Sequence, residues 1–219
     1  MEKKTTELVF ILDKSGSMSG LESDTIGGYN AMLKKQQEEA GEAIVTTVLF
    51  DDNYEILHDR TDIKGIKPIT DKEYYVGGLT ALLDAIGKTI HKIVNATKHT
   101  AKEHQAEKVI FIITTDGMEN ASREYNFEKI KNMIEHQKTK YNWEFIFLGA
   151  NIDAVSTARD LGINEDRAVK YHADPQGTTL NYNVVSETIL KMRANKNVDA
   201  SWKKDIEDDY VRRGGKDKK

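Results

Sequence analysis

Two uninterrupted apolar runs constrain the fold of this chain more than any other feature. They are residues 8–12, Leu-Val-Phe-Ile-Leu, and residues 109–113, Val-Ile-Phe-Ile-Ile. A strand that is apolar on both faces is typical of the centre of a parallel sheet, where helices cover both surfaces. Elsewhere, short apolar segments alternate with longer ones whose apolar residues recur at three- and four-residue spacing. This alternation predicts an α/β fold built on a mostly parallel sheet.

The expected architecture is a doubly wound, Rossmann-like domain with helices on both faces of a six-stranded sheet. All strands are expected to be parallel except one, which forms an antiparallel hairpin at the edge. The predicted strands cover residues 7–12, 43–50, 54–58, 108–114, 143–148 and 168–171. The predicted helices begin near residues 21, 80, 124, 153 and 178, with Thr80 as the N-cap of the second.

Small side chains with oxygen atoms follow the first apolar run directly. Asp13, Ser15 and Ser17 occupy alternate positions, so their oxygen atoms can point the same way in an extended loop. Oxygen donors of this kind suit a hard cation such as Mg2+, with Mn2+ or Ca2+ as alternatives. One short loop cannot complete an octahedral shell, so we expect further ligands from other loops.

Two later residues can complete this cation site. Thr80 stands at a helix start after a pair of glycines, and Asp116 follows the second apolar run. Ligands of open α/β sheets bind beyond the carboxyl ends of the strands, so these residues are expected at the same edge as Asp13. The sequence therefore predicts a metal site formed by Asp13, Ser15, Ser17, Thr80 and Asp116.

Each of these residues has a simpler explanation when it is taken alone. Asp13 or Thr80 can cap a helix, and Asp116 can belong to an ordinary turn. Occurring together, the five positions favour the cation site.

Other polar residues at strand ends also have simpler roles, Asp51 and Asp52 in a hairpin turn and Asn151 and Asp153 in helix capping. Contact with a ligand is the lesser alternative for both pairs.

Composition excludes several classes of site. The chain has 219 residues and no cysteine, which excludes a disulfide framework, a thiolate zinc site and a cysteine nucleophile. The formal net charge of -4 gives no reason to expect nucleic acid or an anionic membrane as a partner. No run approaches the ~18 apolar residues of a membrane helix. We therefore expect a cytoplasmic protein, with Lys14 solvated and able to steer an acidic partner.

The segments Asp13-Lys14-Ser15-Gly16-Ser17 and Thr115-Asp116-Gly117, together with Thr80, resemble the metal-ion-dependent adhesion site (MIDAS) of von Willebrand factor type A (VWA) domains. The family pattern is Asp-x-Ser-x-Ser on one loop, Thr on a second and Asp on a third. All five positions match. Segments 24–30, 80–87 and 147–151 are also similar to single-domain cytosolic members from bacteria and phages.

The resemblance implies a role for each of the matched residues. Ser15, Ser17 and Thr80 would bind the metal directly, whereas Asp13 and Asp116 would act largely through bound water. Neutral hydroxyls leave much of the charge of the cation uncompensated, so the ion favours an anionic ligand at its open position. In adhesive members of the family that ligand is an Asp or Glu carboxylate of a partner protein. The resemblance therefore implies a metal-dependent protein-binding module. Docking on a larger ATPase assembly would be a special case of this function.

An enzyme is the alternative. A bound Mg2+ could polarise a phosphate ester on the same face, but no general base accompanies the matched residues. The segment 16–20 departs from a nucleophile elbow because its middle residue is Met18, and no Walker loop is present. We predict a non-enzymatic module and keep an Mg2+-dependent phosphoesterase as the alternative.

The sequence also predicts a division of the chain near residue 197. Residues 1–197 are expected to form the VWA domain. Residues 198–219 are rich in charge and end in Gly-Gly-Lys-Asp-Lys-Lys, which favours a flexible tail. Trp202 and Tyr210 are the residues of this segment that could dock on the domain.

Overall fold

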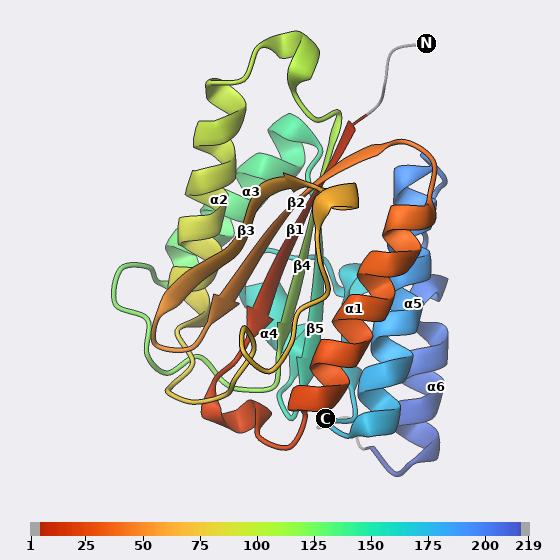
Figure 1. Ribbon diagram of the computed structural model, residues 1–219. Coiled ribbons are helices and arrows are strands. Elements are labelled where there is room, and N and C mark those ends of the chain that lie inside the picture. Colours follow the sequence, from red (N-terminus) through yellow and green to blue (C-terminus); the bar gives the residue numbers. More distant parts are fainter. Residues whose placement is uncertain (1–4, 216–219) are drawn as a thin grey trace.

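Six strands form one sheet in the order β3-β2-β1-β4-β5-β6 (Figure 1). The structure is a computed structural model and describes residues 5–215. Within these residues β3 alone runs antiparallel, against β2, and the other neighbouring pairs are parallel. The predicted α/β fold with one antiparallel edge strand is confirmed. The strands are β1 (Thr5–Asp13), β2 (Glu42–Phe50), β3 (Tyr54–Asp62), β4 (Lys108–Thr115), β5 (Glu144–Ala150) and β6 (Ala168–Tyr171).

Helices cover both faces of the sheet (Figure 1). Helices α1, α5 and α6 pack on one face, and α2, α3 and α4 pack on the other. No helix within residues 5–215 is long and apolar enough to cross a membrane. The helices are α1 (Glu22–Glu38), α2 (Leu82–Lys98), α3 (Phe127–Tyr141), α4 (Ala154–Asp160), α5 (Pro175–Arg193) and α6 (Lys204–Arg212).

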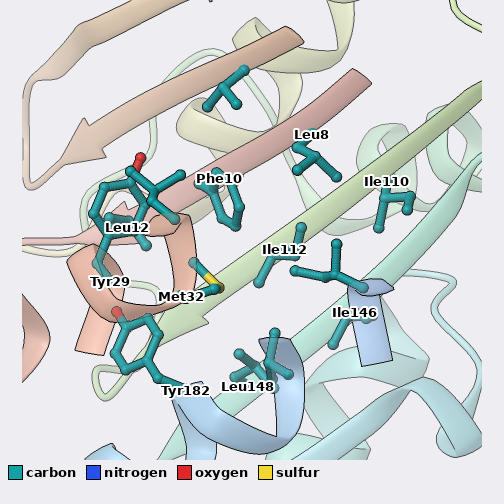
Figure 2. Close-up of a cluster of buried hydrophobic side chains, with 14 of the residues drawn as sticks. Leu8, Phe10, Leu12, Tyr29, Met32, Ile110, Ile112, Ile146, Leu148 and Tyr182 are labelled. Atoms are coloured by element: carbon teal, nitrogen blue, oxygen red, sulfur yellow. The ribbon is translucent and has the colours of Figure 1, made fainter. Parts of the chain in front are cut away.

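The central strand β1 is apolar on both faces because each face has its own core. Leu8, Phe10 and Leu12 point into the cluster beneath α1 and α5, whereas Val9 and Ile11 point into the cluster beneath α2 and α3. Figure 2 shows the first cluster, in which side chains of β1, β4 and β5 meet those of α1 and α5. The doubly buried strand β1 accordingly lies inside the sheet, between β2 and β4.

Helices α1 and α5 approach closely at a glycine. An ideal Cβ on Gly28 would lie 2.3 Å from Cδ2 of Tyr182, so a larger residue would have to displace the ring. Tyr182 itself is buried and faces α1 across the cluster in Figure 2. The Gly27-Gly28 pair thus lowers the intrinsic stability of α1, but Gly28 lets α1 and α5 pack closely.

The C-terminal segment differs from the flexible tail that the sequence predicted. A 3-10 helix (η5, Ala200–Lys203) leads directly into α6. Val198, Trp202 and Ile206 are buried in the core cluster that also contains α5. Trp202 donates a hydrogen bond from Nε1 to the carbonyl oxygen of Asp166 over 2.7 Å. Charge density indicated a tail, but buried apolar residues before η5, within η5 and in α6 hold this segment against the domain. The remaining part of the predicted tail, residues 216–219, lies outside the described residues.

Candidate metal centre

Three loops meet at the carboxyl edge of the sheet, and backbone hydrogen bonds join the first two. Gly16 N donates to Gly78 O over 3.1 Å, and Gly77 N donates to Lys14 O over 2.9 Å. Gly78 adopts a φ of +71°, which glycine tolerates without strain. The loop after β1 and the loop before α2 therefore hold each other in place.

The third loop, which follows β4, closes on the second. Thr80 N donates to Asn120 Oδ1 over 2.9 Å, and Asn120 N donates back to Thr80 O over 3.0 Å. Glu119 Oε2 accepts a hydrogen bond from Leu83 N over 2.9 Å. The three loops that carry the predicted site residues thus form one connected unit.

Thr80 does not cap α2, so that prediction was wrong. The helix begins at Leu82, and its N-cap is Ala81. Glu119 and Ser122 of the third loop accept hydrogen bonds from the N–H groups of the first turn instead. The Thr80 hydroxyl is therefore available for the site.

Three hydroxyl oxygen atoms from two loops form a row. Thr80 Oγ1 lies 3.0 Å from Ser15 Oγ, and Ser15 Oγ lies 3.0 Å from Ser17 Oγ. Adjacent ligands of an octahedral Mg2+ ion, each 2.0–2.1 Å from the metal, are about 3.0 Å apart. Both contacts are hydrogen bonds, and their spacing is also compatible with that of neighbouring ligands of a small divalent cation.

Gly117 leaves room between the ends of this row. An ideal Cβ on Gly117 would lie 2.7 Å from Thr80 Oγ1 and 2.8 Å from Ser17 Oγ. Any side chain at this position would therefore push on the hydroxyls. The absence of a side chain keeps a small cradle open where the oxygen atoms converge.

Asp13 is held firmly at the end of β1. Its Oδ1 accepts a hydrogen bond from Ser15 N over 2.7 Å, and its Oδ2 accepts one from Thr115 Oγ1 over 2.5 Å. The side chain is 1% exposed, and this burial raises the pKa of Asp13 to about 6. Desolvation thus outweighs two hydrogen bonds that favour the charged form.

Asp116 is buried without comparable partners. It is 3% exposed, and neither of its carboxylate oxygens accepts a well-formed hydrogen bond within residues 5–215. Burial raises the pKa of Asp116, and the nearby side chains of Ser17 and Asn151 counter this only in part. A buried carboxylate in this state is costly, and a cation beside it would compensate its charge.

These residues fit a hard cation held by hydroxyls and carboxylates. The structure brings together all five predicted positions, Asp13, Ser15, Ser17, Thr80 and Asp116. A different kind of site, with three or more clustered His, Asp or Glu side chains, does not occur within the described residues. The candidate donor set is therefore dominated by neutral oxygen atoms.

Lys14 is not solvated, contrary to the prediction. Its side chain is buried, donates from Nζ to Glu55 over 2.8 Å and lies 4.4 Å from the centre of the Tyr75 ring. A lysine already paired in this way is poorly placed to steer an acidic partner.

The two other acidic residues at strand ends behave as predicted. Asp51 Oδ1 accepts a hydrogen bond from Asn53 N over 2.5 Å, which closes the β2–β3 turn. Asp153 Oδ1 accepts one from Ser156 N over 3.0 Å and caps α4. Neither residue is needed to explain the cation site.

The sequence interpretation missed three residues that shape the site. Thr115 fixes Asp13, and its place next to Asp116 was a usable signal. Tyr74 donates from its hydroxyl to Asp13 O over 2.5 Å, and Asn120 holds Thr80. Tyr74 and Asn120 lie in irregular segments, where no periodicity indicates which side chains turn inward.

Comparisons with known proteins identify the fold. No protein-family model matches the sequence, and no curated protein matches it. Among solved structures, the D319A mutant of the PilB minor pilin from Streptococcus sanguinis aligns with 86% of the chain at 11% identity and a TM-score of 0.60. Proximal thread matrix protein 1 from the mussel byssus aligns with 87% at 12% identity and a TM-score of 0.56.

Two further solved structures share this fold. A von Willebrand factor type A protein from Catenulispora acidiphila aligns with 84% of the chain at 14% identity and a TM-score of 0.54. Another structure of the mussel protein, with a TM-score of 0.56, has a MIDAS motif occupied by zinc. The chain spans 46% of the mussel protein, 62% of the pilin and 42% of the Catenulispora protein. These likenesses show that the chain has the fold of von Willebrand factor type A domains.

Proposed function

We propose that this chain is a metal-ion-dependent protein-binding module. The observation that carries the proposal is the row of hydroxyls with 3.0 Å spacing beside the unpartnered, buried carboxylate of Asp116. Mg2+ fits the donor set best, with Mn2+ or Ca2+ as alternatives. The residues that would hold the ion are Asp13, Ser15, Ser17, Thr80 and Asp116.

The composition of the donor set also suggests the kind of ligand that the bound ion would accept. Three of the five donors are neutral hydroxyls, and the resemblance to the VWA site implies that Asp13 and Asp116 act largely through bound water. Much of the charge of a directly bound divalent cation would therefore stay uncompensated. Ser17 is exposed, which places one end of the row at the protein surface. An Asp or Glu side chain of a partner protein supplies the missing negative charge. The partner would be a protein rather than a nucleic acid or a membrane.

An Mg2+-dependent phosphoesterase remains the alternative, and the geometry favours it less. Asp13 is hydrogen-bonded through both oxygen atoms, and Lys14 is paired with Glu55. Neither group is well placed as a general base or acid beside a substrate. We therefore propose a non-enzymatic role, as an accessory subunit of a larger complex in the cytoplasm of a bacterium or phage-infected cell.

The test compares partner capture by three forms of the full chain. Wild type, Thr80→Ala and Thr80→Ser are immobilised and incubated with lysate, with Mg2+ or with EDTA. Wild type and Thr80→Ser, which both keep the hydroxyl, should retain a partner that EDTA releases. Thr80→Ala should not retain it, although its net charge is unchanged. Hydrolysis of phosphate esters that requires Mg2+ and falls in Thr80→Ala would favour the enzyme instead.

A further inference from the structure

A groove lies between α2 and α3, and none of the five candidate metal-site residues lines it. It encloses about 470 Å³. Its floor contains Ile90, Val94 and Met133, which pack against the core cluster on this side of the sheet. Val94 and Met133 are only partly buried, so the floor presents apolar surface to solvent. The groove is therefore a site where an apolar side chain of another molecule would gain from burial.

The rim of the groove is basic, although the whole chain is acidic. Lys98 of α2 and Lys129 of α3 line it together with His91 and His136, and all four are exposed. Of the groove-lining residues in the described chain, none is Asp or Glu. The formal net charge of the protein is -4, so this rim departs in sign from the average surface.

Two acidic side chains near the groove, Glu135 of α3 and Glu124 in the loop before α3, are directed elsewhere or already paired. Glu135 lies on the far side of α3, where an ideal Cβ on Gly162 would be 3.2 Å from its Cγ. Glu124 pairs with Lys88 over 2.8 Å. The positive charges of Lys98 and Lys129 therefore remain available to an incoming carboxylate.

One end of the groove is organised by Tyr125. Its hydroxyl lies 2.6 Å from Nδ1 of His91, and Nζ of Lys129 lies 4.1 Å from the centre of its ring. The ring packs against Gly87, where a Cβ would lie 2.4 Å from its Cδ1 and Cε1. These contacts hold a lysine and a histidine beside the apolar floor before any partner arrives.

The floor also contains an unused hydrogen-bond acceptor. Gln137 is 6% exposed, and its Oε1 accepts no hydrogen bond from the residues that the structure describes. A buried carbonyl of this kind is stabilised when a donor reaches it.

We propose that the α2–α3 groove binds an acidic amphipathic helix of a partner protein. The apolar side of that helix would lie on Val94 and Met133, and its carboxylates would face Lys98 and Lys129. From Ile90 to Lys98 the groove follows α2 for about 12 Å, which matches roughly two turns of a bound helix. Binding would not involve the metal site, so it should persist in EDTA.

The probe for this proposal is a synthetic stapled helix with leucines at positions i, i+3, i+4 and i+7 and glutamates on both flanks. A second peptide carries lysine in place of every glutamate. Binding to the full chain in EDTA is measured by fluorescence anisotropy, and amide chemical shifts locate the contact. The acidic peptide should bind saturably and shift amides of α2 and α3, whereas the basic peptide should not.

Charge-reversed variants make the assignment specific. Lys98→Glu with Lys129→Glu should weaken binding about tenfold, as expected for losing two exposed ion pairs. Lys34→Glu with Lys67→Glu makes the same charge change at exposed lysines outside the groove and should leave binding nearly unchanged. Equal weakening in both variants, no saturable binding, or shifts on another face would overturn the proposal. Self-association of the chain through the same amides would assign the groove to a second copy and would also overturn it.

Discussion

Thr115 donates a hydrogen bond to Oδ2 of Asp13 over 2.5 Å, although 102 positions separate the two residues in the sequence. The bond joins the carboxyl ends of the neighbouring parallel strands β1 and β4. The two buried carboxylates of the site differ in their hydrogen bonds. Both oxygens of Asp13 accept one, whereas neither oxygen of Asp116 accepts a well-formed one within the described residues. This difference favours Asp13 as the residue that orders the loop and Asp116 as the charge that a cation would compensate.

Asp116→Asn should separate the stability of the fold from metal binding. In EDTA the variant should be as stable as wild type or more stable by about 1 kcal/mol, because a buried, unpartnered charge is removed. Added Mg2+ should raise the free energy of unfolding of wild type and leave that of the variant unchanged. Urea denaturation with and without Mg2+ measures both effects. Asp51→Asn, which alters only a turn at a neighbouring strand end, should keep the Mg2+ response. An equal response in Asp116→Asn would contradict the assignment.

Metal-free protein should lose stability as the pH rises from about 4 to about 6. Burial raises the pKa of Asp13 to about 6 in the folded state, against about 3.9 in the unfolded chain. The folded state therefore binds the proton more tightly, and this contribution is complete below pH 4 and lost as the pH passes 6. The shift corresponds to about 3 kcal/mol. Denaturation in EDTA across this range should show a steeper loss for wild type than for Asp13→Asn. Parallel curves would exclude the effect.

Gly117→Ala should weaken metal binding without unfolding the protein. The new Cβ would lie within 2.8 Å of Thr80 Oγ1 and Ser17 Oγ, so the two hydroxyls must move apart. Displaced ligands or supporting residues typically reduce metal affinity roughly 10–100-fold. Isothermal titration with Mg2+ or Mn2+ measures this loss. Gly65→Ala is the control, since no atom of the described chain lies within 4 Å of an ideal Cβ there. Wild-type affinity in Gly117→Ala would show that the cradle is not the binding site.

Substitution of two neighbouring glycines of α1 by alanine should change the stability of the protein in opposite directions. Within the described chain no atom lies within 4 Å of an ideal Cβ on Gly27, so Gly27→Ala should stabilise the helix by about 0.5–1 kcal/mol. Gly28→Ala should destabilise the protein by about 1–3 kcal/mol, because the Tyr182 ring must shift within a packed core. Thermal and urea unfolding of the two variants provide the comparison. Stabilisation by both would mean that α1 and α5 pack less closely than described.

Trp202→Ala should show whether the C-terminal helix belongs to the folded unit. Trp202 is 7% exposed and bonded to Asp166, and removal of a buried Trp side chain typically costs about 3–5 kcal/mol. Val211→Ala on the exposed side of α6 should have little effect, because Val211 is 66% exposed. A loss of stability confined to Trp202→Ala in urea denaturation is the expected result. A mobile segment would give no loss in either variant.

The parts of the fold that depend on local pattern were predictable. Residues 8–12 and 109–113 are apolar on both faces because helices cover both sides, and their position at the centre of the sheet followed from that. The five oxygen-bearing residues that the sequence singled out also lie close together at the carboxyl edge of the sheet, whereas their role as metal ligands stays a prediction. The local pattern did not reveal the long-range contacts, and these contacts determine the structural role of each side chain at the site.

Thr80 and Lys14 illustrate this limit. A threonine before a helix is a reasonable N-cap, but Glu119 and Ser122, from a loop far along the chain, take that role. A lysine in a polar loop is usually solvated, but Glu55 of β3 draws Lys14 into the protein. In both cases the competing partner is distant in sequence, and no local propensity identifies it.

The flexible-tail prediction for the C-terminal segment rested on its charges, whereas the structure agrees with the alternative that Trp202 docks on the domain. Val198, Trp202 and Ile206 lie in the core cluster, although only Ile206 belongs to α6. Lys203 is also buried, with Nζ bonded over 2.8 Å to the carbonyl oxygens of Glu165 and Ala168. Lys203 was treated as one of the solvated charges of this segment, but it is buried and hydrogen-bonded to the domain.

The contact between Lys203 and Ala168 helps to protect the edge of the sheet from pairing with another chain. β6 is the last strand of the sheet, and an unprotected last strand offers its backbone for pairing with a strand of another chain. Lys203 occupies the carbonyl of Ala168 in β6, and α6 packs beside the strand. A chain cut before residue 198 would expose that edge, so its characteristic failure would be strand-to-strand aggregation as well as loss of stability.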